Sequence, residues 1–278
     1  MIDAHFHAWE LARGDYFWLT PELTPVYRDV KISDWAQIAH QHKITGGILV
    51  QAAPTLEETQ YLLEQANQNP IVKGVVGWID MLAPDALIKL KQCAREPLLK
   101  GLRPMLQDIS DPDWILQDQI QPVLHEMSEL GLVLDALIKP QHIQRILKVA
   151  KRHPHLSVVI DHAAKPSIDA LAFNDWATQM KQLAHETDPQ QVMCKMSGIW
   201  TEAPAHSDVE IIRPWCESLL DIWTPKRIIW GSDWPVLEMA GDYSTWREFS
   251  IALMKAYPSH LKALMLGGNA QKMYRLKL

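Results

Sequence analysis

The N-terminus carries two histidines at a spacing that one strand would present together. In MIDAHFHAWE, His5 and His7 are separated by a single residue and follow Ile2 closely. Successive side chains of a strand alternate between its two faces, so a strand here would direct Asp3, His5 and His7 to one face. Imidazoles so placed can bind a metal ion, hold a substrate or transfer a proton. Such a pair also arises by chance, and the rest of the chain decides between these interpretations.

Four further titratable residues lie near the ends of later apolar runs. These are Arg103 in GLRP, His162 in DHAAKP, Lys195 in KMSG and Asp233 in GSDWP. Each has an ordinary structural explanation when taken alone, because Asp233 could cap a turn and His162 could lie in the core. On the alternation of a strand, His162 shares a face with Val158 and Ile160. The recurrence of such residues at strand ends favours a common site.

The residue types in this set allow two kinds of chemistry. His5, His7, His162 and Asp233 offer imidazole and carboxylate donors, which suit one zinc or manganese ion. Without a metal, Asp233 could act as the general base on a water molecule while the histidines donate hydrogen bonds to a substrate carbonyl. The residues themselves leave both alternatives open.

Alternating apolar runs and amphipathic stretches predict the elements that position these residues. Short apolar runs predict eight strands, at 2–7, 47–52, 72–80, 100–106, 132–138, 156–162, 192–198 and 227–233. Amphipathic stretches predict helices at 56–67, 85–93, 115–130, 141–152, 169–186, 208–223, 244–256 and 269–276. The chain is therefore expected to be α/β, a single (β/α)8 TIM-like barrel over residues 1–278, with its chemistry at the carboxyl ends of the strands. An open doubly wound sheet lacks support, because no glycine-rich turn follows the first strand.

One connection is much longer than the others. Residues 8–32, which include ARGDYFWLTPELTPVYRDV, are rich in aromatic residues and proline and show no helical period. Long connections in compact domains are usually lids or binding loops. We expect this first loop to cover the site.

Composition limits the classes of partner. The net charge is -6 and no basic run is present, which argues against nucleic acid or an anionic membrane as the main partner. The three cysteines, at 93, 194 and 216, lack zinc-finger or thioredoxin spacing. No apolar run approaches the length of a membrane span, and no signal peptide is recognisable. We expect a cytoplasmic protein with a small-molecule partner, either a monomer or a homo-oligomer.

Five motifs together resemble a known family. They are HFH (5–7), DHAAKP (161–166), KMSG (195–198), GSDWP (231–235) and GGNAQKMY (267–274). Their order and spacing, from Met1 to about Tyr274, resemble the amidohydrolase superfamily. Within it they resemble the amidohydrolase-2 lactonase branch, which includes L-fucono- and L-rhamnono-lactonases and 2-pyrone-4,6-dicarboxylate lactonase. The resemblance implies a distorted (β/α)8 barrel that hydrolyses a lactone.

The resemblance also implies residue roles. His5, His7 and His162 would line the hydrolytic centre, Asp233 would take a proton from the attacking water, and Arg103 would reach the substrate near its carbonyl. The residues expected to shape the pocket and bind the substrate are Trp18, Trp78, Lys195 and Trp234.

This sequence departs from the wider superfamily at two strands. The fourth strand offers Arg103 in place of a bridging lysine or glutamate, and the fifth, LVLDALI, offers no histidine. These departures argue against a two-metal centre. They leave either one ion, held by His5, His7, His162 and Asp233, or no required metal, as the resemblance implies for several relatives.

The substrate expectation depends on the polar residues near the strand ends. A dicarboxylate such as a pyrone dicarboxylate needs several cationic clamps, and only Arg103 is available there, with Arg13 and Arg28 in the first loop. A neutral sugar aldono-lactone of the fucono- or rhamnono- type needs hydroxyl partners, for which the candidates are Tyr16, Tyr27, Gln51, Asp80, Trp200 and Glu202. The alternatives are the pyrone-type lactonase, a zinc-dependent decarboxylase of the same superfamily, and a binding barrel without catalysis.

Overall fold

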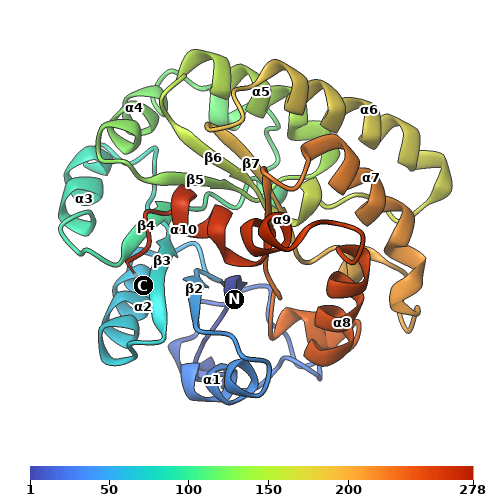
Figure 1. The fold of residues 1–278 in the computed structure, drawn as a ribbon. Helices are drawn as coiled ribbons and strands as arrows, with labels where there is room; N and C mark the ends of the chain where they lie inside the picture. Colours follow the sequence, from blue (N-terminus) through green and yellow to red (C-terminus); the bar gives the residue numbers. More distant parts are fainter. Residues whose placement is uncertain (278) are drawn as a thin grey trace.

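Eight parallel strands follow one another around the centre of the molecule in the order of the sequence (Figure 1). They are, in this computed structural model of residues 1–277, β1 (Ile2–Phe6), β2 (Gly46–Val50), β3 (Val72–Gly77), β4 (Leu99–Leu102), β5 (Val133–Ala136), β6 (Ser157–Ile160), β7 (Val192–Met196) and β8 (Ile228–Trp230). The predicted eight-stranded barrel is confirmed. The N-terminus lies at the end of the barrel where the strands begin (Figure 1), and Lys277 lies beside the starts of β3 and β4 at the same end.

The first and last strands close the barrel through backbone hydrogen bonds of predicted site residues. The Asp233 N–H donates to the His5 carbonyl at 2.8 Å, and the His7 N–H donates to the Trp234 carbonyl at 2.8 Å. Closure therefore places Asp233 beside both N-terminal histidines, although these residues are more than two hundred positions apart in sequence.

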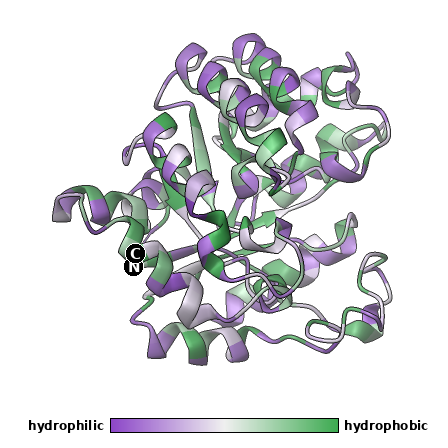
Figure 2. Ribbon diagram, turned by 90° about the vertical axis from the view of Figure 1, so that its right-hand side faces the viewer, coloured by the Kyte–Doolittle hydropathy of each residue, from purple (hydrophilic) through white to green (hydrophobic). Residues whose placement is uncertain are grey.

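Helices surround the strands and expose hydrophilic residues, while hydrophobic residues concentrate on the strands they cover (Figure 2). They are α1 (Ile32–Gln41), α2 (Leu56–Gln68), α3 (Ala86–Cys93), α4 (Gln121–Glu129), α5 (Ile143–Arg152), α6 (Ala170–Glu186), α7 (Arg213–Trp223), α8 (Tyr243–Leu253), α9 (Ser259–Ala263) and α10 (Asn269–Met273). The sequence pattern did not predict α1 and α9. Within residues 1–277, no helix has the length and apolar character needed to cross a bilayer.

Two helices begin later than predicted, and proline explains both. α4 begins at Gln121 and α7 at Arg213, each with a proline in its first turn. Proline is tolerated there because the first N–H groups of a helix have no intrahelical partner. The residues before them form separate short turns, at Trp114–Leu116 and Val209–Ile212.

Most strands end earlier than the apolar runs predicted. β4 stops at Leu102, β6 at Ile160 and β8 at Trp230, so that Arg103, His162 and Asp233 all lie just beyond the sheet. Of the predicted site residues, His5 lies within β1, while these three lie on the loops at the mouth of the barrel.

Candidate active site

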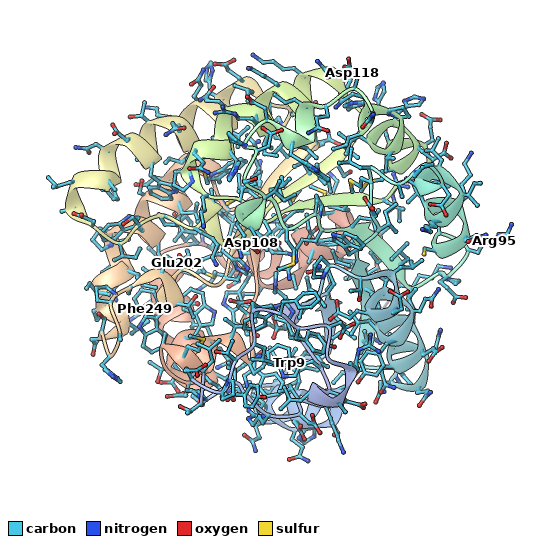
Figure 3. The ribbon with its side chains drawn as sticks, turned by 180° about the vertical axis from the view of Figure 1, so that it is seen from behind. Trp9, Arg95, Asp108, Asp118, Glu202 and Phe249 are labelled. Carbon is cyan, nitrogen blue, oxygen red and sulfur yellow. The ribbon has the colours of Figure 1, made fainter. Side chains whose placement is uncertain are left out.

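A small cleft of about 160 Å³ opens at the carboxyl ends of the strands. Its lining combines ionisable side chains with an apolar wall: His7, Trp18, Ala52, Arg103, Met105, Gln107, Asp108, Leu137, His162, Lys165, Asp233 and Val236. Asp108 lies near the centre of this face of the molecule (Figure 3). The size and the lining suit a small polar molecule.

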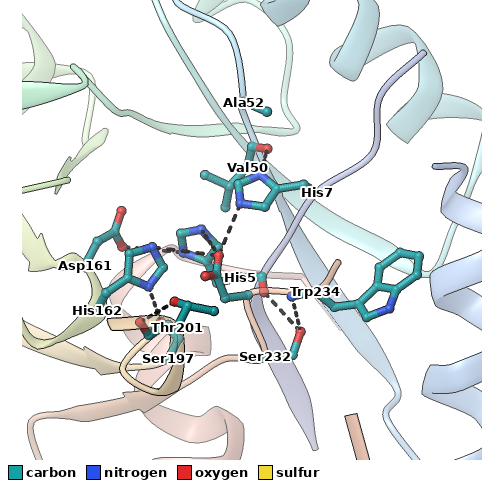
Figure 4. A network of polar contacts seen from close by, with 12 residues as sticks. His5, His7, Val50, Ala52, Asp161, His162, Ser197, Thr201, Ser232 and Trp234 are labelled. Atoms are coloured by element: carbon teal, nitrogen blue, oxygen red, sulfur yellow. Dashed lines mark hydrogen bonds and ion pairs between the residues drawn. The ribbon is translucent and has the colours of Figure 1, made fainter. Parts of the chain in front are cut away.

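Three imidazoles converge on one carboxylate oxygen in the cleft (Figure 4). Asp233 Oδ1 lies 3.3 Å from His7 Nε2, 3.5 Å from His5 Nε2 and 3.8 Å from His162 Nε2. All four side chains are buried. The structure thus brings together the four residues predicted as a general base with its histidine partners, or as a metal-binding set.

Hydrogen bonds on the far side of two rings fix how they face Asp233. His7 Nδ1–H donates to the Val50 carbonyl at 2.7 Å, so its Nε2 points toward the carboxylate. His162 Nδ1 is hydrogen-bonded to Ser197 Oγ at 3.0 Å, which directs its Nε2 inward in the same way. Ser197 belongs to the KMSG motif, so this contact joins that motif to His162 of the DHAAKP motif.

Burial and charge set the protonation of these groups. Burial alone would raise the pKa of Asp233, but the neighbouring His162, His7 and His5 outweigh it and hold that pKa well below its usual range. Burial lowers the pKa of His162 to about 4, against the opposing charges of Asp233 and Asp161. Burial and the charge of Lys195 lower the pKa of His5. At neutral pH the site therefore holds an ionised carboxylate beside neutral His5 and His162.

A second polar layer lies beneath His5, and it contains Lys195. The Lys195 ammonium is fully buried and ion-paired with Asp135 at 2.5 Å and with Asp161 at 2.9 Å. Tyr274 O–H donates to both oxygens of Asp135, at 2.8 and 2.9 Å. Lys195 Nζ is also 3.2 Å from His5 Nδ1. Lys195 was predicted to bind substrate, but the structure places it fully buried and outside the cleft lining, where it supports His5 through Nδ1.

Arg103 is positioned between the cleft and the second layer. Its Nε–H donates to Gln51 Oε1 at 2.9 Å and its terminal nitrogen to the Gln51 carbonyl. The other terminal nitrogen lies 3.3 Å from His5 Nε2 and 3.7 Å from Asp161. Gln51, predicted to bind a hydroxyl, instead orients Arg103. The guanidinium is thereby held rigidly at the wall of the cleft beside His5.

Asp3 and the two N-terminal histidines do not share a face, contrary to the simple alternation. The pairing of β1 with β2 is irregular between Asp3 and Phe6, and His5 lies inward while Asp3 faces the helices. Asp3 accepts hydrogen bonds from Ser232 N–H at 2.8 Å, Ser232 O–H at 2.7 Å and Tyr243 O–H at 3.0 Å. Asp3 therefore fixes the GSDWP turn, which carries Asp233, against β1.

His162 also reaches the cleft by a route that strand alternation does not describe. Val158 and Ile160 pack outward against the helices, so the expected row of Val158, Ile160 and His162 is wrong. Residues 162–165 all have positive φ values, of 51°, 53°, 63° and 46°, which form one left-handed turn. Each such residue costs about 1 kcal/mol or more. Asp161 takes the inward position instead, and no pattern in the sequence distinguishes it as a residue of the site.

The three tryptophans predicted to bind substrate have different positions. Trp18 lines the cleft, and its indole N–H donates to the Ala52 carbonyl at 2.8 Å. It lies in the long segment between β1 and α1, whose ends are paired through Trp9 and Val30. Trp234 is buried and its indole points away from the imidazoles, toward Glu238 at 2.7 Å (Figure 4). Trp78 is half-buried beyond β3 and does not contribute to the cleft lining.

Replacing Gly198 with alanine is expected to lower activity about 100-fold or more. Gly198 has a φ of +57°, and a Cβ there would lie 2.3 Å from His162 Nδ1 and 2.9 Å from Asp233 Oδ2. Displacement of reacting groups by about 1 Å can cost this much. The matched control is Gly14→Ala, since Gly14 has a φ of +72° with no atom within 4 Å of the added Cβ. Equal kcat/KM values for the two variants would contradict the steric argument.

The arrangement of donors fits a single metal ion. Zinc bonds of about 2.0–2.2 Å in tetrahedral geometry separate neighbouring donor atoms by about 3.3–3.6 Å. His5, His7 and Asp233 lie close enough together to share one ion, and their Nε2 atoms are 3.5 and 3.3 Å from Asp233 Oδ1, within this range. His162 Nε2 is farther from that oxygen, at 3.8 Å, and lies outside this group of three. A second group of potential ligands, His5, Asp161 and His162, is also present. The Asp161 carboxylate of this second group already pairs with the Lys195 ammonium, which supplies a positive charge at that position.

Comparisons with known proteins agree with this site. An L-fucono-1,5-lactonase of Burkholderia ambifaria is 38% identical, across 99% of this chain and 95% of that protein. An L-fucono-1,5-lactonase of Burkholderia multivorans is 29% identical, across 99% and 96%. A crystal structure of an amidohydrolase from Burkholderia multivorans with bound zinc has a TM-score of 0.93 at 27% identity, covering 99% of both chains.

A family model confirms the resemblance seen in the motifs. The model of the family described as Amidohydrolase matches residues 2–276, which include all the site residues discussed above. The match covers nearly the whole chain, and the eight strands place its histidines and aspartate at one barrel mouth. This chain therefore belongs to the amidohydrolase family, and it is a hydrolase.

Proposed function

We propose that this protein hydrolyses the cyclic ester of a sugar aldono-lactone of the fucono- or rhamnono- type. One observation carries the proposal: an ionised carboxylate, Asp233, meets three imidazoles in a cleft that only a small molecule can enter. The L-fucono-1,5-lactonase relative at 38% identity supports the substrate class.

Asp233 acts as the general base in the proposed reaction. It takes a proton from water, whose oxygen forms a bond to the lactone carbonyl carbon, and the carbonyl oxygen becomes an oxyanion. Collapse of this intermediate breaks the bond to the ring oxygen, which leaves as a hydroxyl after receiving the proton back from Asp233. The product is the open hydroxy acid, and all atoms of water are accounted for.

Arg103 is the main donor to the developing oxyanion. It lines the cleft, is buried and is locked by Gln51, so its N–H groups need no reorientation during the reaction. A preorganised donor of this kind supplies about 3 kcal/mol of transition-state stabilisation. The neutral imidazole of His162 lines the cleft beside the reacting carbonyl, while His5 lies fully buried behind Asp233 and Arg103.

A neutral lactone suits the cleft better than a dicarboxylate. Arg13 and Arg28, considered as additional clamps, are paired instead with Asp15 and Glu238, each at 2.7 Å, and neither lines the cleft. Two cationic residues, Arg103 and Lys165, line the cleft, and the acidic residue Asp108 lines it with them. A second carboxylate on the substrate would therefore meet the negative charge of Asp108.

The decarboxylase alternative gains no support from the fifth strand. Such an enzyme would carry a further metal-binding histidine on this strand. The buried ionisable residue of β5 is instead Asp135, which is paired with Lys195. This carboxylate is committed to the second layer, away from the cleft.

A bound zinc ion would polarise the carbonyl and lower the pKa of water; His5, His7 and Asp233 would hold it, with His162 beside them. We propose that hydrolysis does not require it, because the buried guanidinium of Arg103 already supplies a positive charge in the cleft lining.

Acid release from sugar lactones, followed with a pH indicator with and without a chelator, tests this proposal. We expect hydrolysis of aldono-lactones at the same rate in both conditions, and little or none of 2-pyrone-4,6-dicarboxylate. Activity that disappears with chelator and returns with zinc or manganese would instead make the histidines metal ligands. Acid release from no lactone would contradict the lactonase assignment.

A further inference from the structure

Lys165 lines the cleft but has no part in the hydrolytic steps described above. Its side chain is partly buried, with 22% of its surface exposed, and its ammonium pairs with Glu202 Oε1 at 2.9 Å. Glu202 lies near the centre of the face that surrounds the barrel mouth (Figure 3). A lysine held at this place by a single carboxylate keeps two further N–H groups available.

The left-handed turn links Lys165 to the reacting centre. Lys165 ends the turn that begins at His162, and its backbone N–H donates to the His162 carbonyl at 2.8 Å. Ala163 and Ala164 between them are fully buried, and the Ala163 carbonyl accepts the Trp176 indole N–H at 2.8 Å. One rigid turn therefore presents two polar side chains to the same cleft, three residues apart.

Four consecutive residues with positive φ need a reason, since a right-handed turn would cost less. Continuation of the turn to Lys165 brings a second side chain of the cleft lining onto the same rigid turn as His162. This geometry suits a group that binds the part of a substrate distant from its carbonyl.

The pair formed by Lys165 and Glu202 matches the chemistry of hydroxyl groups. An ion pair carries no net charge, so it does not attract an anion strongly, but it offers N–H donors and carboxylate acceptors side by side. Sugar hydroxyls both donate and accept hydrogen bonds. Gln107, whose side-chain carbonyl is buried without a hydrogen-bond partner, lines the same cleft and can accept another.

We propose that Lys165, held by Glu202, is a specificity-determining residue that binds the ring or exocyclic hydroxyls of the substrate. This inference rests on the proposed lactonase function and refines it. The site selects a polyhydroxylated lactone over a bare one, because loss of the hydroxyls leaves the free N–H groups of the Lys165 ammonium without partners in the cleft.

Comparison of two substrates with the same ring tests the inference. The substrates are a five-membered aldono-lactone and γ-butyrolactone, which lacks the hydroxyls. Lys165→Met is expected to lower kcat/KM for the aldono-lactone about 10- to 100-fold, mainly through KM, and to change that for γ-butyrolactone by less than about twofold. Glu202→Gln should act in the same direction. The control, Lys151→Met, removes a lysine paired with Glu186 on the outer surface and should change neither substrate.

An equal loss on both substrates, or no loss on either, would overturn the role of Lys165 while leaving the lactonase function intact. A wild-type protein that hydrolyses no lactone of any ring size would contradict the lactonase function instead. Calorimetric binding of the corresponding unreactive lactam then tests Lys165 directly. Weaker binding to Lys165→Met supports hydroxyl recognition, and equal binding overturns it.

Discussion

Replacing Asp233 with asparagine is expected to lower kcat/KM for a sugar lactone by about 10²- to 10⁴-fold, the usual contribution of a general base. Asparagine has nearly the same shape but cannot take a proton from water. It also removes the negative charge that the three Nε2 atoms face within 3.8 Å. The measurement is steady-state hydrolysis in the presence of chelator, so that loss of a metal ligand does not contribute.

The matched control is Asp118→Asn. Asp118 is exposed on the loop before α4 and lies at the edge of the molecule, far from the barrel mouth (Figure 3). This change should leave kcat/KM within about twofold, as is usual for an exposed residue remote from the site. If Asp233→Asn retained activity like that of the control, another group would have to be the base.

Replacing Lys195 with methionine is expected to lower the free energy of unfolding by about 3–5 kcal/mol, which is typical for breaking a buried ion pair. Methionine fills much of the volume but leaves Asp135 and Asp161 buried near each other without the ammonium. His5 loses its lower support as well, so activity should fall together with stability. The measurement is the midpoint of urea unfolding, with hydrolysis assayed on the folded fraction.

Two variants sharpen this experiment. Lys89→Met removes the lysine of an exposed pair with Asp85 and should change stability by less than about 1 kcal/mol. The double variant Lys195→Met/Asp135→Asn removes one of the stranded charges and should recover part of the loss. A wild-type midpoint for Lys195→Met would show that the buried network contributes little to the fold.

The period and length of the apolar runs were enough to predict the architecture. Each of the eight runs became a strand because a parallel sheet buried on both faces needs continuous apolar residues. The predicted strand ends were less accurate, since residues such as Arg103 extend the run in sequence but leave the ladder in space. α1 was missed because its ten residues follow a long connection that carries no helical period.

His5, His7, His162, Arg103 and Asp233 were identifiable because ionisable residues at strand ends have few structural uses. The convergence of these side chains on one point could not be predicted, because it depends on closure of β1 against β8 and on an irregularity in β1. Lys195 shows the limit most clearly. Its position near a strand end suggested the cleft, yet alternation within the barrel directs it downward to Asp135 and Asp161.

By itself, the sequence determined the barrel, the family and the residue types available for hydrolysis, because these depend on local period and on motifs read along the chain. Only the tertiary structure decided which of those residues share the cleft. The left-handed turn from His162 to Lys165 and the close approach of Gly198 to His162 both arise from backbone conformations that break strand alternation. Such conformations are stabilised by contacts between distant segments, and for that reason no local pattern predicts them.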